Sequence, residues 1–328
     1  MSSLDRFQRR NCSVSCKALR AHLAAFFLST AVVAGIAPVS AQPAPVLRIG
    51  TTPIDAGAQP YYAAAMGFFR DAGITVEITS MSSGAAIAAA VASGAIDIAQ
   101  SNVVSLASAH EKGLPFVLLA PASMYLSQSP QTALIVRADS PVRSAKDLTG
   151  KVIAINGLKN IAEIGASSWL DANGGTSSSV RYVEMPMSTM SAALSRGSID
   201  AGVVSEPDLT DALSHGFRVV GNIYDAIGKH FVIGAWFTTI QFAQAHPDLV
   251  RNYAAVMLQT ARWANRNHAT SGKILEAEFK TPVTPGTKRV VFGETLERAD
   301  IQAPIDAAAR YGALKASFPA ASIMLPPQ

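Results

Sequence analysis

The sequence predicts an α/β protein of two lobes, each a mainly parallel sheet flanked by helices, with a hinge between them. Three observations lead to this fold. First, an apolar helix, a Gly-x-Ile-Asp turn, a short apolar strand and a polar tip occur in that order twice, at residues 85–102 and 190–207. Second, strands alternate with helices over most of the chain, which is typical of doubly wound sheets. Third, the 328-residue chain is long for a single hydrophobic core.

The first 41 residues are predicted to be a secretory signal peptide. Basic residues precede an apolar stretch at residues 23–36, and small residues follow it up to Ala41, near which we expect cleavage. The apolar stretch is short for a membrane span, so a membrane anchor is the less favoured alternative. Cys12 and Cys16 both lie in this leader, which leaves no thiol for a disulfide or for catalysis in the mature chain.

The charge of the mature chain is balanced. The formal net charge of +4 comes from the leader, after which 22 basic and 22 acidic residues remain. A balanced chain without a basic run argues against a nucleic-acid partner. The later histidines stand alone, and no nucleotide-binding or nucleophile motif occurs, so we expect no metal, no cofactor and no enzymatic activity.

The elements of the first lobe follow from apolar periodicity and from glycine and proline stops. In order they are a strand at 46–51, a helix at 60–72 closed by Gly73, a strand at 74–79, the alanine-rich helix, a strand at 96–100, a helix at 102–112 and an apolar strand at 116–122. We assign residues 42–131 to this lobe.

The second lobe, residues 132–236, repeats this alternation. Its expected elements are strands at 132–137, 152–156, 180–184 and 218–221, a helix at 161–173 and the second copy of the repeated unit. A strand at 231–239 then returns to the first lobe, which residues 237–328 complete. Four amphipathic helices are expected there, at 247–267, 273–279, 285–292 and 301–311.

Ligands of open α/β sheets bind beyond the carboxyl ends of the strands. Gln100, Ser101 and Asn102 follow a strand of the first lobe, and Ser205 and Glu206 follow the corresponding strand of the second. The repeated unit therefore predicts two sets of polar side chains facing each other across a cleft.

A series of motifs in fixed order also carries a family resemblance. The motifs are Pro60-Tyr61-Tyr62, Met66-Gly67-Phe68-Phe69, Ser82-Ser83-Gly84, Gly94-Ala95-Ile96-Asp97, Asp147-Leu148-Thr149-Gly150-Lys151 and Gly197-Ser198-Ile199-Asp200-Ala201. With them the chain resembles the periplasmic substrate-binding proteins of ABC importers, in the NMT1/THI5-like group that binds sulfonates, nitrate, taurine and thiamine precursors. The resemblance implies a type II periplasmic-binding-protein fold, a small-molecule ligand, and a monomer that delivers it to a permease and its ATPase at the inner membrane.

The resemblance also implies which residues touch the ligand, because it places them on loops after strands. These are Thr52, Asp55, Gln59, Ser82, Ser83, Gly84, Gln100, Ser101, Asn102, Asn156, Lys159, Asn160, Ser205 and Glu206. Tyr61, Tyr125 and Trp236 are the aromatic side chains expected near the cleft or hinge.

Several of these residues have alternative interpretations. The serines can cap helices, and Lys159 can be an ordinary surface lysine. For Glu206 we favour a structural role, because Pro207 follows it as a helix start. For Trp236 we favour core packing.

The resulting functional hypothesis is a periplasmic receptor for a small organic anion, an aromatic or aliphatic carboxylate or sulfonate that pairs with Lys159. The alternative ligand is a neutral heterocycle such as a thiamine-precursor pyrimidine, with Glu206 as its partner. An enzyme on the same fold is less favoured, because the mature chain lacks cysteine and no histidine follows a strand.

Overall fold

The computed structural model describes residues 46–325 apart from 82, 83, 281 and 285. The predicted signal peptide, with Cys12, Cys16 and Ala41, lies outside the described residues. Residues 44–328 form one compact unit, to which the described helices and strands belong. Within the described part of the chain, no helix is long and apolar enough to cross a membrane.

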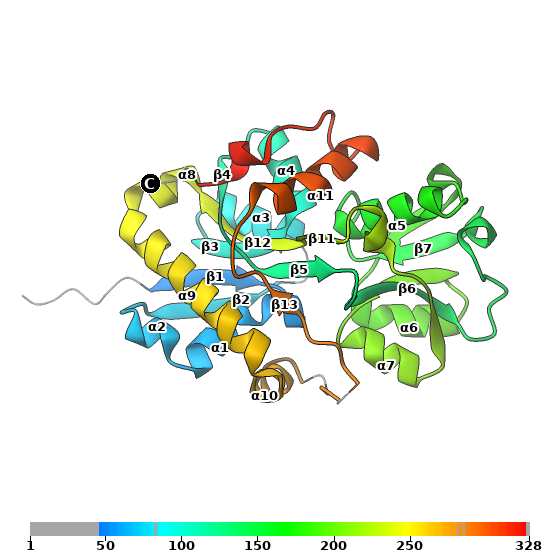
Figure 1. The fold of residues 1–328 in the computed structure, drawn as a ribbon, viewed down its shortest axis with the longest axis horizontal. Coiled ribbons are helices and arrows are strands. Elements are labelled where there is room, and N and C mark those ends of the chain that lie inside the picture. The colour runs from blue at the N-terminus through cyan, green and yellow to red at the C-terminus, as the bar shows by residue number, and fades with distance from the viewer. Residues whose placement is uncertain (1–45, 82–83, 281, 285, 326–328) are drawn as a thin grey trace, which may run out of the picture. The chain divides into compact units, whose positions relative to one another are not determined.

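Two five-stranded sheets form the centres of the two lobes (Figure 1). The first sheet has the order β2 (Val76–Ser80), β1 (Leu47–Thr51), β3 (Ile98–Asn102), β12 (Gly234–Thr239), β4 (Phe116–Pro121). The second has the order β10 (Phe217–Gly221), β6 (Thr132–Arg137), β9 (Ala201–Ser205), β7 (Val152–Ile155), β8 (Arg181–Glu184). We call the elements around them the first and second lobe. The exact residues at which the lobes divide remain a prediction.

Parallel and antiparallel pairings coexist in both sheets. β1 pairs in parallel with β2 and β3, while β12 runs antiparallel to β3 and β4. In the second sheet, β7 is parallel to β8 and β9, and β6 is antiparallel to β9 and β10. The antiparallel strands arise where the chain enters a sheet from the other lobe, as β6 and β12 do.

A small antiparallel sheet joins the lobes. It consists of β11 (His230–Val232), β5 (Ser123–Leu126) and β13 (Val291–Phe292), in that order. β5 leads through residues 127–131 into β6, and β11 follows residues 222–229 on the way back to β12. We call it the hinge sheet, because the chain passes between the lobes only beside it within the described residues.

Helices flank these sheets (Figure 1). Before the first crossing they are α1 (Gln59–Ala65), α2 (Phe68–Asp71), α3 (Gly84–Ala92) and α4 (Val103–Glu111). The second lobe contributes α5 (Ile161–Ala172), α6 (Met187–Ser195) and α7 (Asp208–Ser214), and the C-terminal part α8 (Ile240–Ala245), α9 (Pro247–Arg266), α10 (His268–Phe279) and α11 (Arg298–Arg310). Short 3-10 helices occupy Asp55–Gly57, Ala145–Leu148, Ser177–Ser179, Ile223–Ala226 and Ala320–Ile323.

The repeated Gly-x-Ile-Asp unit makes the same local structure twice. Gly94 and Gly197 have φ of +74° and +69°, the left-handed region that glycine adopts at helix ends. The carboxylates of Asp97 and Asp200 then accept from the main-chain N–H of Arg48 and Val152, each at 2.8 Å. Both aspartates therefore fasten a strand to its neighbour inside a lobe.

One predicted helix is wrong. Residues 286–290 are a turn and extended chain, and Val291–Phe292 pairs with β5. The apolar run 290–292 suited a helix by spacing, but its two valines and phenylalanine favour a strand where a partner edge is available.

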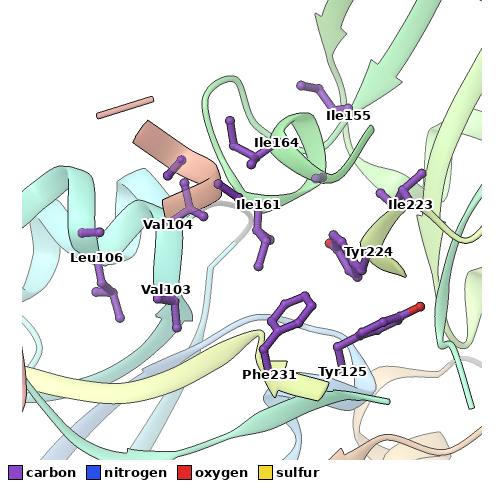
Figure 2. Packing of buried hydrophobic residues seen from close by; sticks show 14 of the residues in the cluster. Val103, Val104, Leu106, Tyr125, Ile155, Ile161, Ile164, Ile223, Tyr224 and Phe231 are labelled. Atoms are coloured by element: carbon purple, nitrogen blue, oxygen red, sulfur yellow. The ribbon is translucent and has the colours of Figure 1, made fainter. Parts of the chain in front are cut away.

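An apolar cluster extends from the first lobe through the hinge sheet into the second (Figure 2). The residues labelled there are Val103, Val104, Leu106, Tyr125, Ile155, Ile161, Ile164, Ile223, Tyr224 and Phe231. The Tyr125 ring contacts Phe231 and Tyr224, with centroids 5.2 Å and 5.5 Å apart. Burial of this surface holds the hinge aromatics in place.

Candidate functional site

A cavity lies between the two lobes at the carboxyl ends of β1, β3, β7 and β9. It encloses about 1070 Å³ of space free of protein atoms, part of it open to solvent. Nine predicted ligand-binding residues line it: Thr52, Gly84, Gln100, Ser101, Asn102, Asn156, Asn160, Ser205 and Glu206. These residues come from the ends of five strands, β1, β2, β3, β7 and β9.

The wall from the first lobe and hinge sheet carries hydroxyl groups without partners. The side-chain oxygens of Thr52, Ser101 and Ser123 are buried and accept or donate no hydrogen bond. Among the described residues only one further buried side-chain atom is unpaired, the Tyr253 hydroxyl in the core. A buried unpaired hydroxyl costs about 1–3 kcal/mol. Three such groups therefore belong to one cavity, where a polar solute or an ordered water can supply their partners.

Helix α3 begins beside this wall. A Cβ added to Gly84, the first residue of α3, would lie 2.7 Å from the Ser101 hydroxyl. Any larger residue would therefore displace the Ser101 hydroxyl, whereas glycine leaves it in its place on the cavity wall. Ser82 and Ser83, predicted to act with Gly84, lie outside the described residues.

Two asparagines line the cavity while they cap helices. The Asn102 Oδ1 accepts from the Ser105 N–H at 2.9 Å at the start of α4. The Asn160 Oδ1 accepts from the Ala162 and Glu163 N–H groups at 2.9 and 3.2 Å at the start of α5. The Asn160 amide also donates to Asn156 at 2.9 Å. Each asparagine thus combines helix capping with cavity lining, whereas the sequence suggests capping for the serines.

The Lys159 ammonium is directed to a glutamate. Lys159 has φ of +55°, its N–H donates to Glu163 Oε2 at 2.7 Å, and its Nζ lies 3.1 Å from Glu163 Oε1. It does not line the cavity. The preceding residue, Leu158, does, with 55% of its surface exposed. The loop therefore presents an apolar side chain to the cavity where a cation was predicted.

The charged side chains on the described cavity wall are both acidic: Glu184 and Glu206. Glu206 is 3% exposed and accepts from the Thr210 N–H and hydroxyl at 3.0 and 2.9 Å. Burial raises the pKa of its carboxyl, and bonds from Thr210 and from the Lys288 main chain partly offset this. Glu184 is exposed and accepts from the Leu158 N–H at 3.2 Å.

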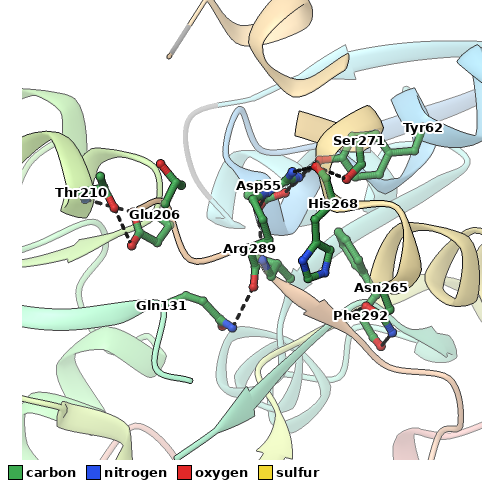
Figure 3. A network of polar contacts seen from close by, with 12 residues as sticks. Asp55, Tyr62, Gln131, Glu206, Thr210, Asn265, His268, Ser271, Arg289 and Phe292 are labelled. Atoms are coloured by element: carbon green, nitrogen blue, oxygen red, sulfur yellow. Dashed lines mark hydrogen bonds and ion pairs between the residues drawn. The ribbon is translucent and has the colours of Figure 1, made fainter. Parts of the chain in front are cut away.

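Five other predicted residues lie away from the cavity lining. The Asp55 carboxylate binds the Arg289 guanidinium and the Tyr62 hydroxyl (Figure 3). Gln59 and Trp236 bind each other in the core. Tyr61 contacts Ser80 and the Phe279 ring, and the Tyr125 hydroxyl donates to Asp225 at 2.8 Å. Each of these side chains has a partner within the protein.

Other lining residues were not predicted, among them Ser105, Ser123, Leu158, Glu184, Met187 and Tyr224. Glu184 is the last residue of β8 and Met187 begins the helix after it, so the strand-end rule applied to that strand would have found them. Ser105 stands three residues after the cap of α4, on the turn that faces the same way. Ser123 and Tyr224 come from the hinge, where the sequence shows no such pattern.

Comparisons with known proteins agree with this geometry. The family model described as NMT1/THI5 like matches residues 57–269. The alkanesulfonate-binding protein SsuA from Xanthomonas axonopodis pv. citri, bound to MOPS, is 19% identical with a TM-score of 0.72, covering 87% of this chain and 99% of that one. No curated protein sequence matches the chain.

Two further solved structures are similar. The aliphatic sulphonate-binding protein SsuA from Escherichia coli is 15% identical, with a TM-score of 0.71 and coverage of 87% and 94%. The nitrate-binding protein NrtA from Synechocystis PCC 6803 is 16% identical, with a TM-score of 0.69 and coverage of 85% and 84%. The predicted two-lobed α/β fold of periplasmic binding proteins is confirmed.

Proposed function

The chain belongs to the NMT1/THI5-like family, and from this we propose that it is the solute-binding protein of an ABC importer. It closes over one small polar solute between its lobes and presents it to a permease and its ATPase. We further propose that it acts as a monomer in the periplasm after removal of residues 1–41. The fold it shares with sulfonate- and nitrate-binding proteins supports this proposal.

The observation that carries the proposal is the group of unpaired hydroxyls on one cavity. Thr52, Ser101 and Ser123 come from three separate strand regions, and each buries an oxygen without a partner. A solute that supplies those partners recovers the cost of leaving them unpaired. Residues of the second lobe, among them Asn160 and Ser205, line the same cavity, so a solute bound there would touch both lobes and favour closure.

The charge of the cavity favours a neutral solute with N–H donors, and the heterocycle is therefore our first choice of ligand. Glu184 and Glu206 are among the described residues that line the cavity, and no lysine, arginine or histidine is. An anion would be repelled by both carboxylates, and Lys159 is already paired with Glu163. Tyr224 and Leu158 provide apolar surface for a ring.

An organic anion is the second candidate. Helices α4 and α5 begin at the cavity, and helix N-termini attract negative charge. The MOPS-bound relative gives this candidate further support. Against it, Asn102 and Asn160 already occupy N–H groups at these helix ends.

We infer binding without catalysis. The titratable groups on the described wall are Glu184, Glu206 and Tyr224, and both glutamates accept bonds from main-chain N–H groups. A serine or threonine nucleophile would need a neighbouring base. The hydroxyls of Thr52, Ser101 and Ser123 lie on the cavity wall, but none of them has a hydrogen bond to a side chain that could act as a base.

A thermal-shift screen tests the ligand class. Cytosine, thymine and a thiamine-precursor pyrimidine are compared with butanesulfonate, benzoate and nitrate. A ligand at 100 times its Kd adds about 2.7 kcal/mol of stability. We expect a shift from a heterocycle that Ser101→Ala weakens and Lys159→Ala leaves unchanged. A shift from anions alone, abolished by Lys159→Ala, would instead establish the anion receptor.

A further inference from the structure

The side-chain amide of Gln100 is buried at the cavity and has no hydrogen-bond partner among the described residues. Gln100 belongs to β3, is 5% exposed and lines the cavity. The other two buried glutamines of the described chain have bonded amides. The Gln59 Nε2 donates to the Met257 carbonyl at 2.7 Å, and the Gln131 Nε2 donates to the Arg289 carbonyl at 3.2 Å. Because burying a polar group without a partner is unfavourable, the Gln100 amide is a group that a bound molecule can satisfy.

A glycine makes room for this amide beside an unpaired hydroxyl. A Cβ added to Gly234 would overlap the Gln100 Nε2 and lie 3.1 Å from the Ser123 hydroxyl oxygen. Gly234 begins β12 and pairs with Asn102, the last residue of β3. Ser123, the first residue of β5, is 2% exposed, and its hydroxyl has no partner. One unpaired amide and one unpaired hydroxyl therefore lie next to each other on the same part of the cavity wall.

A side-chain amide binds a particular kind of polar edge. It presents an N–H donor and a C=O acceptor in one plane, and an amide, lactam or amidine carries the complementary acceptor and donor. Glutamine binds the edge of adenine through two such parallel bonds. A carboxylate, sulfonate or nitrate offers acceptors only, so the Gln100 oxygen would face another oxygen. Half a turn of the amide exchanges its donor and its acceptor, so either order along the edge of the solute is accommodated.

The apolar side chains of the cavity suit the faces of a ring. Ile54, Tyr224 and Ile233 all line it. The Ile233 N–H donates to the Ser123 carbonyl at 2.9 Å, so Ile233 lies directly beside the unpaired hydroxyl. These side chains can contact the faces of a ring while Gln100 and Ser123 bind its polar edge.

We propose that Gln100 is the specificity-determining residue of the cavity. Its amide forms two parallel hydrogen bonds with the amide or amidine edge of a small neutral ring compound, and the Ser123 hydroxyl makes a third. This inference rests on the function proposed above, because the cavity must be the solute site. A ring compound without such an edge is rejected, because it leaves the N–H or the C=O of the Gln100 amide buried without a partner.

Two pairs of neutral compounds of nearly equal shape test this assignment. δ-Valerolactam is compared with cyclohexanone, in which a methylene replaces the N–H, and benzamide with acetophenone, in which a methyl replaces the amino group. Ligand-observed NMR titration of the protein gives the Kd of each compound. We expect the wild type to bind the amide of each pair about tenfold more tightly than the ketone, because the ketone lacks one hydrogen bond and leaves a buried acceptor unpaired.

Three variants assign the preference to residues. Gln100→Met keeps the length of the side chain without its amide and should bind both members of a pair equally. Gln241→Met, the same change at an exposed residue of α8, is the matched control and should keep the wild-type preference. Ser123→Ala removes a hydroxyl that has no partner, so it should melt no lower than the wild type and bind both amides more weakly.

Circular dichroism and melting verify that each variant is folded. If Gln100→Met does not fold, the wild-type preference and the loss in Ser123→Ala decide the question. Equal binding of both members of each pair by the wild type would overturn the assignment, and so would an unchanged preference in Gln100→Met, because another residue would then bind the edge. Binding of butanesulfonate or nitrate without either amide would overturn it while the solute-binding function stands. Binding of none of these compounds would count against both proposals.

Discussion

The indole Nε1 of Trp236 donates a hydrogen bond of 2.7 Å to the Gln59 Oε1, although the residues are 177 positions apart. The Gln59 Nε2 donates in turn to the Met257 carbonyl at 2.7 Å. Both side chains are fully buried. One glutamine thus ties β12 to α1 and α9, in the first lobe and away from the cavity lining.

Replacing Trp236 with phenylalanine should destabilise the protein without affecting the solute site. The Gln59 oxygen would lose its partner, which costs about 1–3 kcal/mol for a buried polar group. Urea unfolding of Trp236→Phe measures this loss, and the thermal shift produced by solute should be as in the wild type. Phe237→Leu, a neighbouring core change that leaves the hydrogen bond intact, is the control. If Trp236→Phe keeps the wild-type urea midpoint but binds the solute more weakly, Trp236 belongs to the ligand site after all.

The fold could be predicted because its signals are local. Gly94 and Gly197 end their helices in the left-handed region, and Asp97 and Asp200 fasten the following strands, so the repeated unit encodes the same structure twice. The helix expected at 285–292 failed because a neighbouring strand decided the outcome. That neighbour, β5, is remote in sequence.

The site could be predicted in part, for a similar reason. Strand ends located Gln100, Ser101 and Glu206 correctly at one cavity. They could not show which nearby polar groups have a partner inside the protein. Asp55 looks like a cleft residue until Arg289, 234 positions later, occupies its carboxylate. Lys159 likewise looks free until its pairing with Glu163 is known.

Glu206 should make stability depend on pH in a defined direction. Burial raises the pKa of its carboxyl in the folded protein. As pH rises past the ordinary glutamate value of about 4.3 toward the raised value, the unfolded chain loses its proton before the folded one. The native state therefore loses stability over that interval. Glu206→Gln, a neutral isostere that still accepts from Thr210, should lack this loss when melting is followed from pH 4 to 7.

Glu184→Gln, which replaces an exposed carboxylate of the same cavity, is the matched control for the substitution itself. A Glu206→Gln profile parallel to that of the wild type would show that another group causes the dependence.

Lys159 should be replaceable when the new residue tolerates its backbone angle. Its φ of +55° is left-handed, a region that asparagine enters readily and β-branched residues do not. Lys159→Asn should therefore cost only what the ion pair with Glu163 contributes, a pair in which the Lys159 side chain is 57% exposed and that of Glu163 7%. Lys159→Val should cost about 1–2 kcal/mol more. Chemical denaturation measures the free energy of unfolding of both variants. If both lose the same amount, the ion pair with Glu163 and not the backbone angle determines the stability at this position.

Adding a methyl group at Gly84 should impair the site and spare the fold. The new Cβ would lie 2.7 Å from the Ser101 hydroxyl, so that hydroxyl must move from its place on the cavity wall. The helix itself should not be weakened, because Gly84 is the first residue of α3 and alanine is a better helix former than glycine. We expect Gly84→Ala to melt no lower than wild type and to lose most of the shift given by the active solute of the screen. Gly286→Ala is the control, because a Cβ there comes no nearer than 4.0 Å to the Thr284 hydroxyl, and it should retain the thermal shift. If Gly84→Ala retains the thermal shift as fully as Gly286→Ala does, Ser101 is not part of the binding site.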